Sequence, residues 1–298
     1  MLIRTLSTAF AAAVLLSVPA HAAPARDWTP IAQALGKAGA EQPDGGYRVA
    51  LPRTDLHVVL DGVPLKAGFA LGSWVAFAPM GSGTMVMGDL VLTQDEVSPV
   101  MKSLEEHGFE ITALHNHLLR AEPATLYMHV MGQGDPVRLA QALHAALSLS
   151  RTPFVAAPAA PPAAEFGVDV AAIDQIIGAK GKVNGGVLQY GIPRKKPVLD
   201  GGMPVPASLG SAIAINFQPT GEGKAAITGD FILAASEVNP VLRALRSNGI
   251  EVTALHNHML DDQPRMFFMH FWANDDAPKL ARGLRAALDQ VAIARPAN

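Results

Sequence analysis

An internal repeat constrains the fold of this chain more than any other feature of its sequence. Residues 88–147 align without a gap to residues 229–288 at a constant offset of 141, and 27 of the 60 aligned pairs are identical. The match continues upstream with small gaps, for example from Pro52-Arg53 to Pro193-Arg194. Solenoid repeats have roughly 20–50 residues, so this longer period indicates two copies of a domain large enough to bury its own core.

Two segments of unusual composition set the expected domain boundaries. Arg4 is the only charged residue among the first 22, an apolar run follows it, and Ala20-His21-Ala22 supplies the small residues that a signal peptidase recognises. We therefore predict a signal peptide at 1–22, removed near Ala22, and a mature protein that is periplasmic or secreted. A linker rich in Pro and Ala is predicted at 153–167. The first repeat domain then spans 23–152 and the second spans 168–298.

Composition limits the partners and the kinds of site. The chain has 23 Lys and Arg against 26 Asp and Glu, whereas a nucleic-acid partner usually needs a basic face, so none is expected. It has no cysteine, so the signal cannot carry a lipid-modified cysteine and no membrane anchor is expected in the mature form. Any metal site must use histidine and carboxylate ligands instead of thiolates.

The order of the apolar patterns predicts the fold class. Each copy begins with strands and continues as a β-α-β-β-α unit. In the first copy the unit consists of strands at 84–92, 109–117 and 125–131 and helices at 94–107 and 135–147. In the second copy the helices fall at 236–248 and 276–290. We therefore predict an α+β protein, a tandem duplication of a β-rich domain with helices packed on one face of its sheet. A ferredoxin-like arrangement is one topology that fits this order.

Six of the ten histidines repeat with the domain. The string Ala-Leu-His-Asn-His occurs at 113–117 and at 254–258, and a third histidine follows the motif in each copy. The two triads are His115, His117 and His129, and His256, His258 and His270. Residues two apart on a strand share a face, and a hairpin centred near Glu122 places His129 opposite His115. A two-residue shift in pairing keeps each triad on one face, whereas a one-residue slip destroys it.

Each triad has the chemistry of a metal site. Histidine is the commonest metal ligand near neutral pH, and three imidazoles leave a fourth position for water, as in catalytic zinc sites. Zinc is the first candidate, and copper and iron also suit imidazole ligands. A purely structural polar cluster is the alternative interpretation. The unrepeated His57, His107 and His144 are interpreted as ordinary packing or surface residues.

Glu96 and Glu237 are the candidate catalytic residues, because both copies retain this glutamate at a junction between strand and helix. A carboxylate there could act as the base beside a metal-bound water. The alternative is a residue of the first helical turn that the helix dipole stabilises. Asp89 and Asp230 are also present in both copies.

The strings Thr-Ala-Leu-His-Asn-His and Met-His-Phe-Trp, with the Gly-Asp-Phe strand before them, resemble a family that includes the mycobacterial lipoproteins LppY and LpqO. The resemblance covers both copies. It implies an exported bacterial protein with a domain of unknown function and assigns no activity or catalytic residue. This chain lacks the lipidation cysteine of the lipoprotein members.

Three functions remain open on the sequence alone. The leading hypothesis is a soluble periplasmic protein that binds, buffers or delivers metal through a three-histidine site in each repeat. The second is a metal-dependent hydrolase that uses a metal-bound water. The third is a metal-free module that binds a small-molecule ligand in the cleft between the domains.

Overall fold

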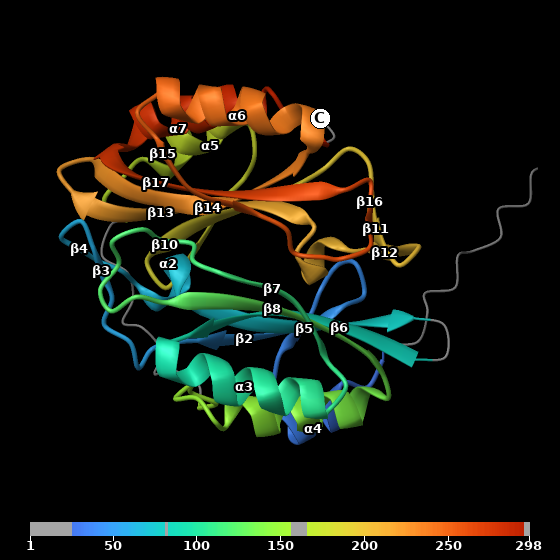
Figure 1. The fold of residues 1–298 in the computed structure, drawn as a ribbon. Helices are drawn as coiled ribbons and strands as arrows, with labels where there is room; N and C mark the ends of the chain where they lie inside the picture. The colour runs from blue at the N-terminus through green and yellow to red at the C-terminus, as the bar shows by residue number, and fades with distance from the viewer. Residues whose placement is uncertain (1–25, 81–82, 156–165, 295–298) are drawn as a thin grey trace, which may run out of the picture.

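Two six-stranded antiparallel sheets form the centre of the protein. The computed structural model describes residues 26–80, 83–155 and 166–294, so the predicted signal peptide and most of the predicted linker lie outside the described residues. Figure 1 shows the two sheets packed face to face, with helices on both outer sides. This four-layer arrangement confirms the predicted α+β class.

The first half contains one sheet and three covering helices. The strand order is β1 (Ala40–Glu41), β2 (Tyr47–Pro52), β5 (Gly72–Met80), β6 (Gly83–Leu92), β8 (Leu126–Gly134) and β7 (Glu110–His115). The helices are α1 (Thr29–Leu35), α3 (Gln94–Glu106) and α4 (Pro136–Leu147). Short elements between β2 and β5 are β3 (Val59–Leu60), β4 (Val63–Pro64) and α2 (Ala67–Ala70).

The second half repeats this plan. Its strand order is β15 (Glu251–His256), β17 (Met266–Asp276), β14 (Lys224–Ala234), β13 (Ala212–Gly221), β10 (Val187–Pro193) and β9 (Lys182–Asn184). Its helices are α5 (Val170–Ile177), α6 (Ala235–Ser247) and α7 (Ala277–Leu288). A small sheet of β12 (Met203–Val205), β11 (Val198–Asp200) and β16 (Asp262–Gln263) and the 3₁₀ helix η1 (Ala207–Leu209) complete it.

The β-α-β-β-α unit of each copy is present as β6-α3-β7-β8-α4 and as β14-α6-β15-β17-α7, with β16 as a short additional strand between β15 and β17. Within the first sheet β8 lies between β6 and β7, and β5 lies on the other side of β6. Strand β5, which pairs with the other side of β6, therefore precedes the β-α-β-β-α unit in the chain. Helices α1 and α5 were not predicted, because segments of seven and eight residues are too short for periodicity to identify.

Strand β6 shows why the sheets are buried on both faces. Its side chains alternate: Val86 and Leu90 pack in the core beneath the helices of the first half, whereas Met85 and Met87 pack in a core shared with the second half. By the same alternation, Asp89 follows Met85 and Met87 and projects between the two sheets. The inner face of each sheet is thus the face on which the repeated polar residues meet.

Segments from each half also form hydrogen bonds with the sheet of the other half. The side-chain amide of Asn216 donates to the carbonyl of Phe69 at 3.0 Å, and that of Gln218 donates to the carbonyl of Pro64 at 2.8 Å. In the opposite direction, Arg48 donates to the carbonyl of Ser208 at 2.6 Å. These bonds fix the two halves relative to one another.

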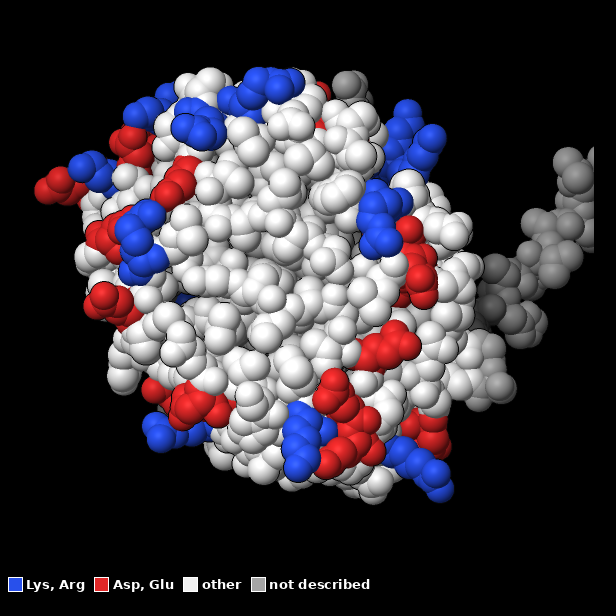
Figure 2. Space-filling view, in the orientation of Figure 1, with Lys and Arg blue, Asp and Glu red and all other residues white. Residues whose placement is uncertain are grey.

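The outer surface carries charge of both signs. On the face that Figure 2 shows, acidic and basic side chains are intermingled around the rim, and the middle is uncharged. Among the described residues, no helix is both long enough and apolar enough to cross a membrane.

Candidate metal centre

The histidine motif lies where an edge strand leaves each sheet. Strand β7 ends at His115 and β15 ends at His256, so the strand predicted at 109–117 is shorter than expected. The chain turns at Asn116, whose side-chain oxygen accepts a hydrogen bond from the N–H of Leu118 at 2.9 Å. This local bond competes with strand pairing, so His117 lies in the turn that follows β7.

The pairing of β7 with β8 differs by two residues from the predicted register. His129 lies opposite Ala113, and His115 lies opposite Tyr127, after an irregularity between Ile111 and Ala113. Because a two-residue shift preserves the face of a strand, His115 and His129 still converge. The second half has the equivalent pairs, with His270 opposite Ala254 and His256 opposite Phe268.

The two predicted triads do not form separate sites, because they meet in one cluster between the sheets. Three pairs of imidazole rings stack across the halves. The ring centroids are 3.5 Å apart for His115 and His256, 3.6 Å for His117 and His270, and 3.7 Å for His129 and His258. The cause is the packing of the sheets, since the histidine face of each sheet is the face that contacts the other sheet.

Aromatic residues close two of these stacks. Tyr127 stacks on His117 and Phe268 stacks on His258, each with ring centroids 3.5 Å apart. Within the first half, the rings of His115 and His129 are inclined by only 7°. Across the repeats, the three stacked pairs of imidazoles have interplanar angles of 27°, 20° and 24°.

Two aspartates flank the histidines, Asp89 buried and Asp230 part-buried. Asp89 is the cross-strand partner of His129, and Asp230 is the partner of His270. Asp230 approaches the Nε2 atoms of His258 and His270 at 3.5 and 3.7 Å, and Asp89 approaches that of His129 at 3.9 Å. The sequence alone shows that both copies retain these carboxylates, and it predicts no role for them. Pairing the predicted strands at 84–92 and 125–131 would have placed Asp89 beside His129.

Polar atoms without partners are concentrated in this cluster. Among the described residues, twelve buried side-chain nitrogen and oxygen atoms have no hydrogen-bond partner, and seven of them belong to these histidines and aspartates. The seven are Oδ1 of Asp89, Nδ1 of His115, Nε2 of His129, Oδ1 of Asp230, and Nε2 of His256, His258 and His270. Buried polar groups are almost always satisfied in native proteins, so this concentration makes the cluster the candidate ligand site.

Backbone carbonyls orient two of the rings as they would orient metal ligands. Nδ1 of His270 lies 2.8 Å from the carbonyl of Gly229, and Nδ1 of His256 lies 3.0 Å from the carbonyl of Asn257. A carbonyl only accepts, so Nδ1 carries the proton and donates, which leaves the Nε2 lone pair free. Gly229 is required there, since a Cβ would lie 2.0 Å from the carbonyl oxygen of Ala214.

Burial sets the protonation states of the cluster. It lowers the pKa of His115 to about 3 and that of His256 to about 4, and it lowers the pKa values of the other four histidines well below their usual range. Burial also raises the pKa of Asp89 to about 7 and that of Asp230 well above its usual range. The imidazoles are therefore neutral at neutral pH, which is the form that ligates a cation.

Glu96 and Glu237 lie in ion pairs instead of in the histidine cluster. Arg53 contacts Glu96 at 2.7 Å, and Arg194 contacts Glu237 at 2.8 Å. Each glutamate also accepts the backbone N–H of the residue that precedes its helix, from Thr93 in the first half. These contacts match the alternative interpretation of the two glutamates as residues that stabilise the start of α3 and α6.

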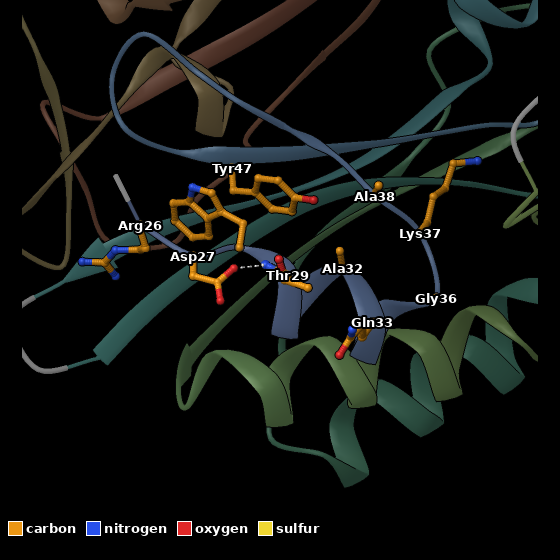
Figure 3. Close-up of a pocket in the computed structure, with 10 residues that line it drawn as sticks. Arg26, Asp27, Thr29, Ala32, Gln33, Gly36, Lys37, Ala38 and Tyr47 are labelled. Carbon is orange, nitrogen blue, oxygen red and sulfur yellow. Dashed lines mark hydrogen bonds between the residues drawn. The ribbon is translucent and has the colours of Figure 1, made fainter. Parts of the chain in front are cut away.

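Two surface hollows lie away from the histidines. One, of about 730 Å³, is lined by residues around α1, with the indole of Trp28 stacked on Tyr47 at a ring-centroid distance of 5.1 Å (Figure 3). The other, of about 750 Å³, lies between residues 61–64 and 218–224 and includes Asn274. The histidines border neither hollow and instead pack against one another.

Comparisons with known proteins add a family and no activity. A family model described as Domain of Unknown Function (DUF1259) matches residues 29–149 and again residues 171–290. No curated protein matches. Among solved structures, a trimeric bacterial microcompartment shell protein, PduB, aligns over 88% of this chain and 97% of its own, with 11% identity and a TM-score of 0.22.

Proposed function

The chain belongs to the DUF1259 family, whose domain it contains in two tandem copies, and we propose that it binds a divalent metal ion where these copies meet. The ligands come from six histidines, three from each copy: His115, His117, His129, His256, His258 and His270. Zinc is the first candidate, and copper and iron are the alternatives that imidazole ligands also suit.

The concentration of unpartnered buried atoms carries this proposal. Seven buried nitrogen and oxygen atoms of the cluster have no partner, and leaving each of them desolvated costs about 1–3 kcal/mol. A cation that accepts their lone pairs removes this cost. Ligand atoms of His115, His117, His256 and His270 already lie within 4.8 Å of one another, so a small movement brings them around one ion.

Binding, buffering or delivery of metal fits the geometry better than hydrolysis. A metal-dependent hydrolase needs a base beside the metal-bound water and space for its substrate. Both carboxylate oxygens of Glu96 and of Glu237 accept hydrogen bonds from arginine and backbone N–H groups. The histidines are packed ring against ring.

We propose that this binding takes place outside the cytoplasm, because residues 1–22 have the pattern of a signal peptide. Metal in the periplasm or the medium would then reach the protein after export.

Metal titration of the purified mature protein tests the proposal. Protein stripped with a chelator is titrated with Zn²⁺, Cu²⁺ and Fe²⁺ and analysed for bound metal after desalting. The variants His115→Ala/His117→Ala and His256→Ala/His258→Ala should lose metal, whereas His57→Ala, which alters an exposed histidine outside the cluster, should bind as the wild type does. A wild-type protein that takes up no metal, or cluster variants with unchanged uptake, would refute it.

A further inference from the structure

We infer that the centre holds two metal ions, each bound by histidines from both repeats. The inference rests on the proposed function and deepens it, because it specifies the number of ions and the ligands of each. One ion is assigned to the stacked pair His117 and His270, and the other to the stacked pair His258 and His129. His115 and His256 lie between these pairs, and each can supply one nitrogen to either ion.

The symmetry of the contacts is the first argument. Exchanging the two repeats maps His117 onto His258 and His270 onto His129, so the two stacked pairs are equivalent. A ligand set built on one pair therefore has a counterpart on the other pair. Two of the sets with ligand atoms within 4.8 Å are built on these pairs: one joins His117 and His270 with His115 and His256, and the other joins His129 and His258 with His115 alone.

The sets made of histidines alone combine ligands from the two repeats. Neither triad from a single repeat is among the sets whose ligand atoms lie within 4.8 Å in the described part of the chain. Two of the four sets, Asp89 with His117 and His129 and Asp230 with His258 and His270, come from one repeat each, whereas both sets made of histidines alone combine the two repeats. The strongest candidate sites are therefore composite.

The number of free ligand atoms is the second argument. A structural zinc ion takes four ligands, whereas seven unpartnered buried atoms belong to the cluster. One ion would leave about three of them buried without a partner. Two four-coordinate ions offer eight positions, enough for all seven atoms and for His117.

The aspartates supply the charge that two adjacent cations require. Asp89 groups with His117 and His129, which belong to different stacked pairs, and Asp230 groups with His258 and His270, which also belong to different pairs. Each carboxylate therefore lies between the two proposed ions and can contact both. Paired ions in proteins lie about 3.5–4 Å apart, and carboxylates between them offset their mutual repulsion.

Crossed double variants test this assignment. His117→Ala/His270→Ala removes one stacked pair and leaves the other intact, so one zinc ion per chain should remain. His117→Ala/His129→Ala removes one histidine from each pair, so both ions should be lost. If each repeat instead held its own ion, the two results would be reversed. Circular dichroism confirms that each variant is folded before the metal is counted.

Native mass spectrometry of the wild-type protein with saturating Zn²⁺ gives a count that does not depend on the variants. Two zinc ions per chain are expected. One ion per chain at saturation would overturn the inference while the proposed metal binding stands, and so would a reversed result of the crossed variants. A wild-type protein without any bound zinc, copper or iron would refute the proposed function itself.

Discussion

His117 of the first repeat stacks on His270 of the second, with ring centroids 3.6 Å apart. The two residues are not equivalent positions of the repeat, because His117 corresponds to His258. The histidines of one copy thus interleave with those of the other copy. Disturbing either copy should therefore affect the whole centre, and this relationship underlies the first prediction.

Metal should stabilise both halves together. A ligand that binds only the folded state stabilises it by about 2.7 kcal/mol at a free concentration of 100 times Kd. We expect the thermal unfolding of the chelator-treated protein to shift upward as one transition when Zn²⁺ is added, and the His117→Ala variant to show a smaller shift. Differential scanning calorimetry measures both. Two separate transitions, of which only one responds to zinc, would contradict this prediction.

Asp89→Asn should affect the metal-free and metal-loaded proteins in opposite ways. Burial raises the pKa of Asp89 to about 7, above its unfolded value of 3.8. The protonated carboxyl therefore favours folding below pH 4, and this contribution is lost as the pH rises through 7. An amide does not ionise, so with chelator present the variant should become more stable relative to wild type between pH 5 and pH 8.

With zinc present the order should reverse, because the amide cannot supply the negative charge that the cation favours. Urea unfolding at pH 5 and at pH 8, with and without zinc, measures both effects. Asp44→Asn, at an exposed aspartate of the same half, is the control. Equal pH dependence of Asp89→Asn and wild type in chelator would show that Asp89 is not a buried acid.

Glu96→Gln should weaken the fold without removing a metal ligand. Burial alone would raise the pKa of Glu96, but hydrogen bonds from Arg53 and from the backbone N–H groups of Thr93 and Arg151 outweigh it and lower the pKa. The ionised carboxylate thus stabilises the fold above its unfolded pKa, and this stability is lost as the pH falls below that value. Arg53 is fully buried, so removing its partner's charge should cost about 3 kcal/mol at pH 7.

The difference in unfolding free energy between Glu96→Gln and wild type should shrink as the pH falls below about 4.5, the ordinary pKa of a glutamate. Guanidinium unfolding over a pH series measures it. Glu105→Gln, at an exposed position of the same helix, should have little effect at any pH. Zinc uptake by folded Glu96→Gln should equal that of wild type, and loss of uptake would restore the glutamate as a functional residue.

Gly229→Ala should damage the centre through the backbone. The added Cβ would lie 2.0 Å from the carbonyl oxygen of Ala214, so the neighbouring strand must move. Overpacking of this kind costs about 1–3 kcal/mol, and it displaces the carbonyl that orients His270. We expect lower stability and weaker zinc binding. Gly191→Ala on β10 of the same sheet, where an added Cβ meets nothing within 4 Å, should leave zinc binding unchanged.

The elements with strong local patterns could be predicted from the sequence. Strand β6 and helices α3 and α4 lie within a few residues of their predicted bounds, because alternation, capping residues and amphipathic spacing are local properties. The convergence of His115 with His129 also followed from strand parity, and it tolerated the wrong register because the shift was two residues.

The composite character of the centre could not be predicted in this way. Whether His117 meets His270 depends on how the two sheets pack, and that packing depends on contacts spread over both inner faces, such as those of Met85 and Met87. Within one copy, the pattern of residues is the same whether the histidines face solvent, a ligand or a second copy. The role of Asp89 was hidden for a simpler reason, since it required the pairing of β6 with β8.

The interleaving of the histidines has a consequence for ancestry. His115 stacks on its equivalent, His256, and exchange of the repeats converts the pair His117 and His270 into the pair His258 and His129. Two identical copies related by a two-fold axis could therefore build the same set of contacts. A one-copy ancestor would then have assembled the centre as an isologous homodimer. Fusion of the two genes would have made that encounter intramolecular, and each half would afterwards have been free to change its outer surface independently.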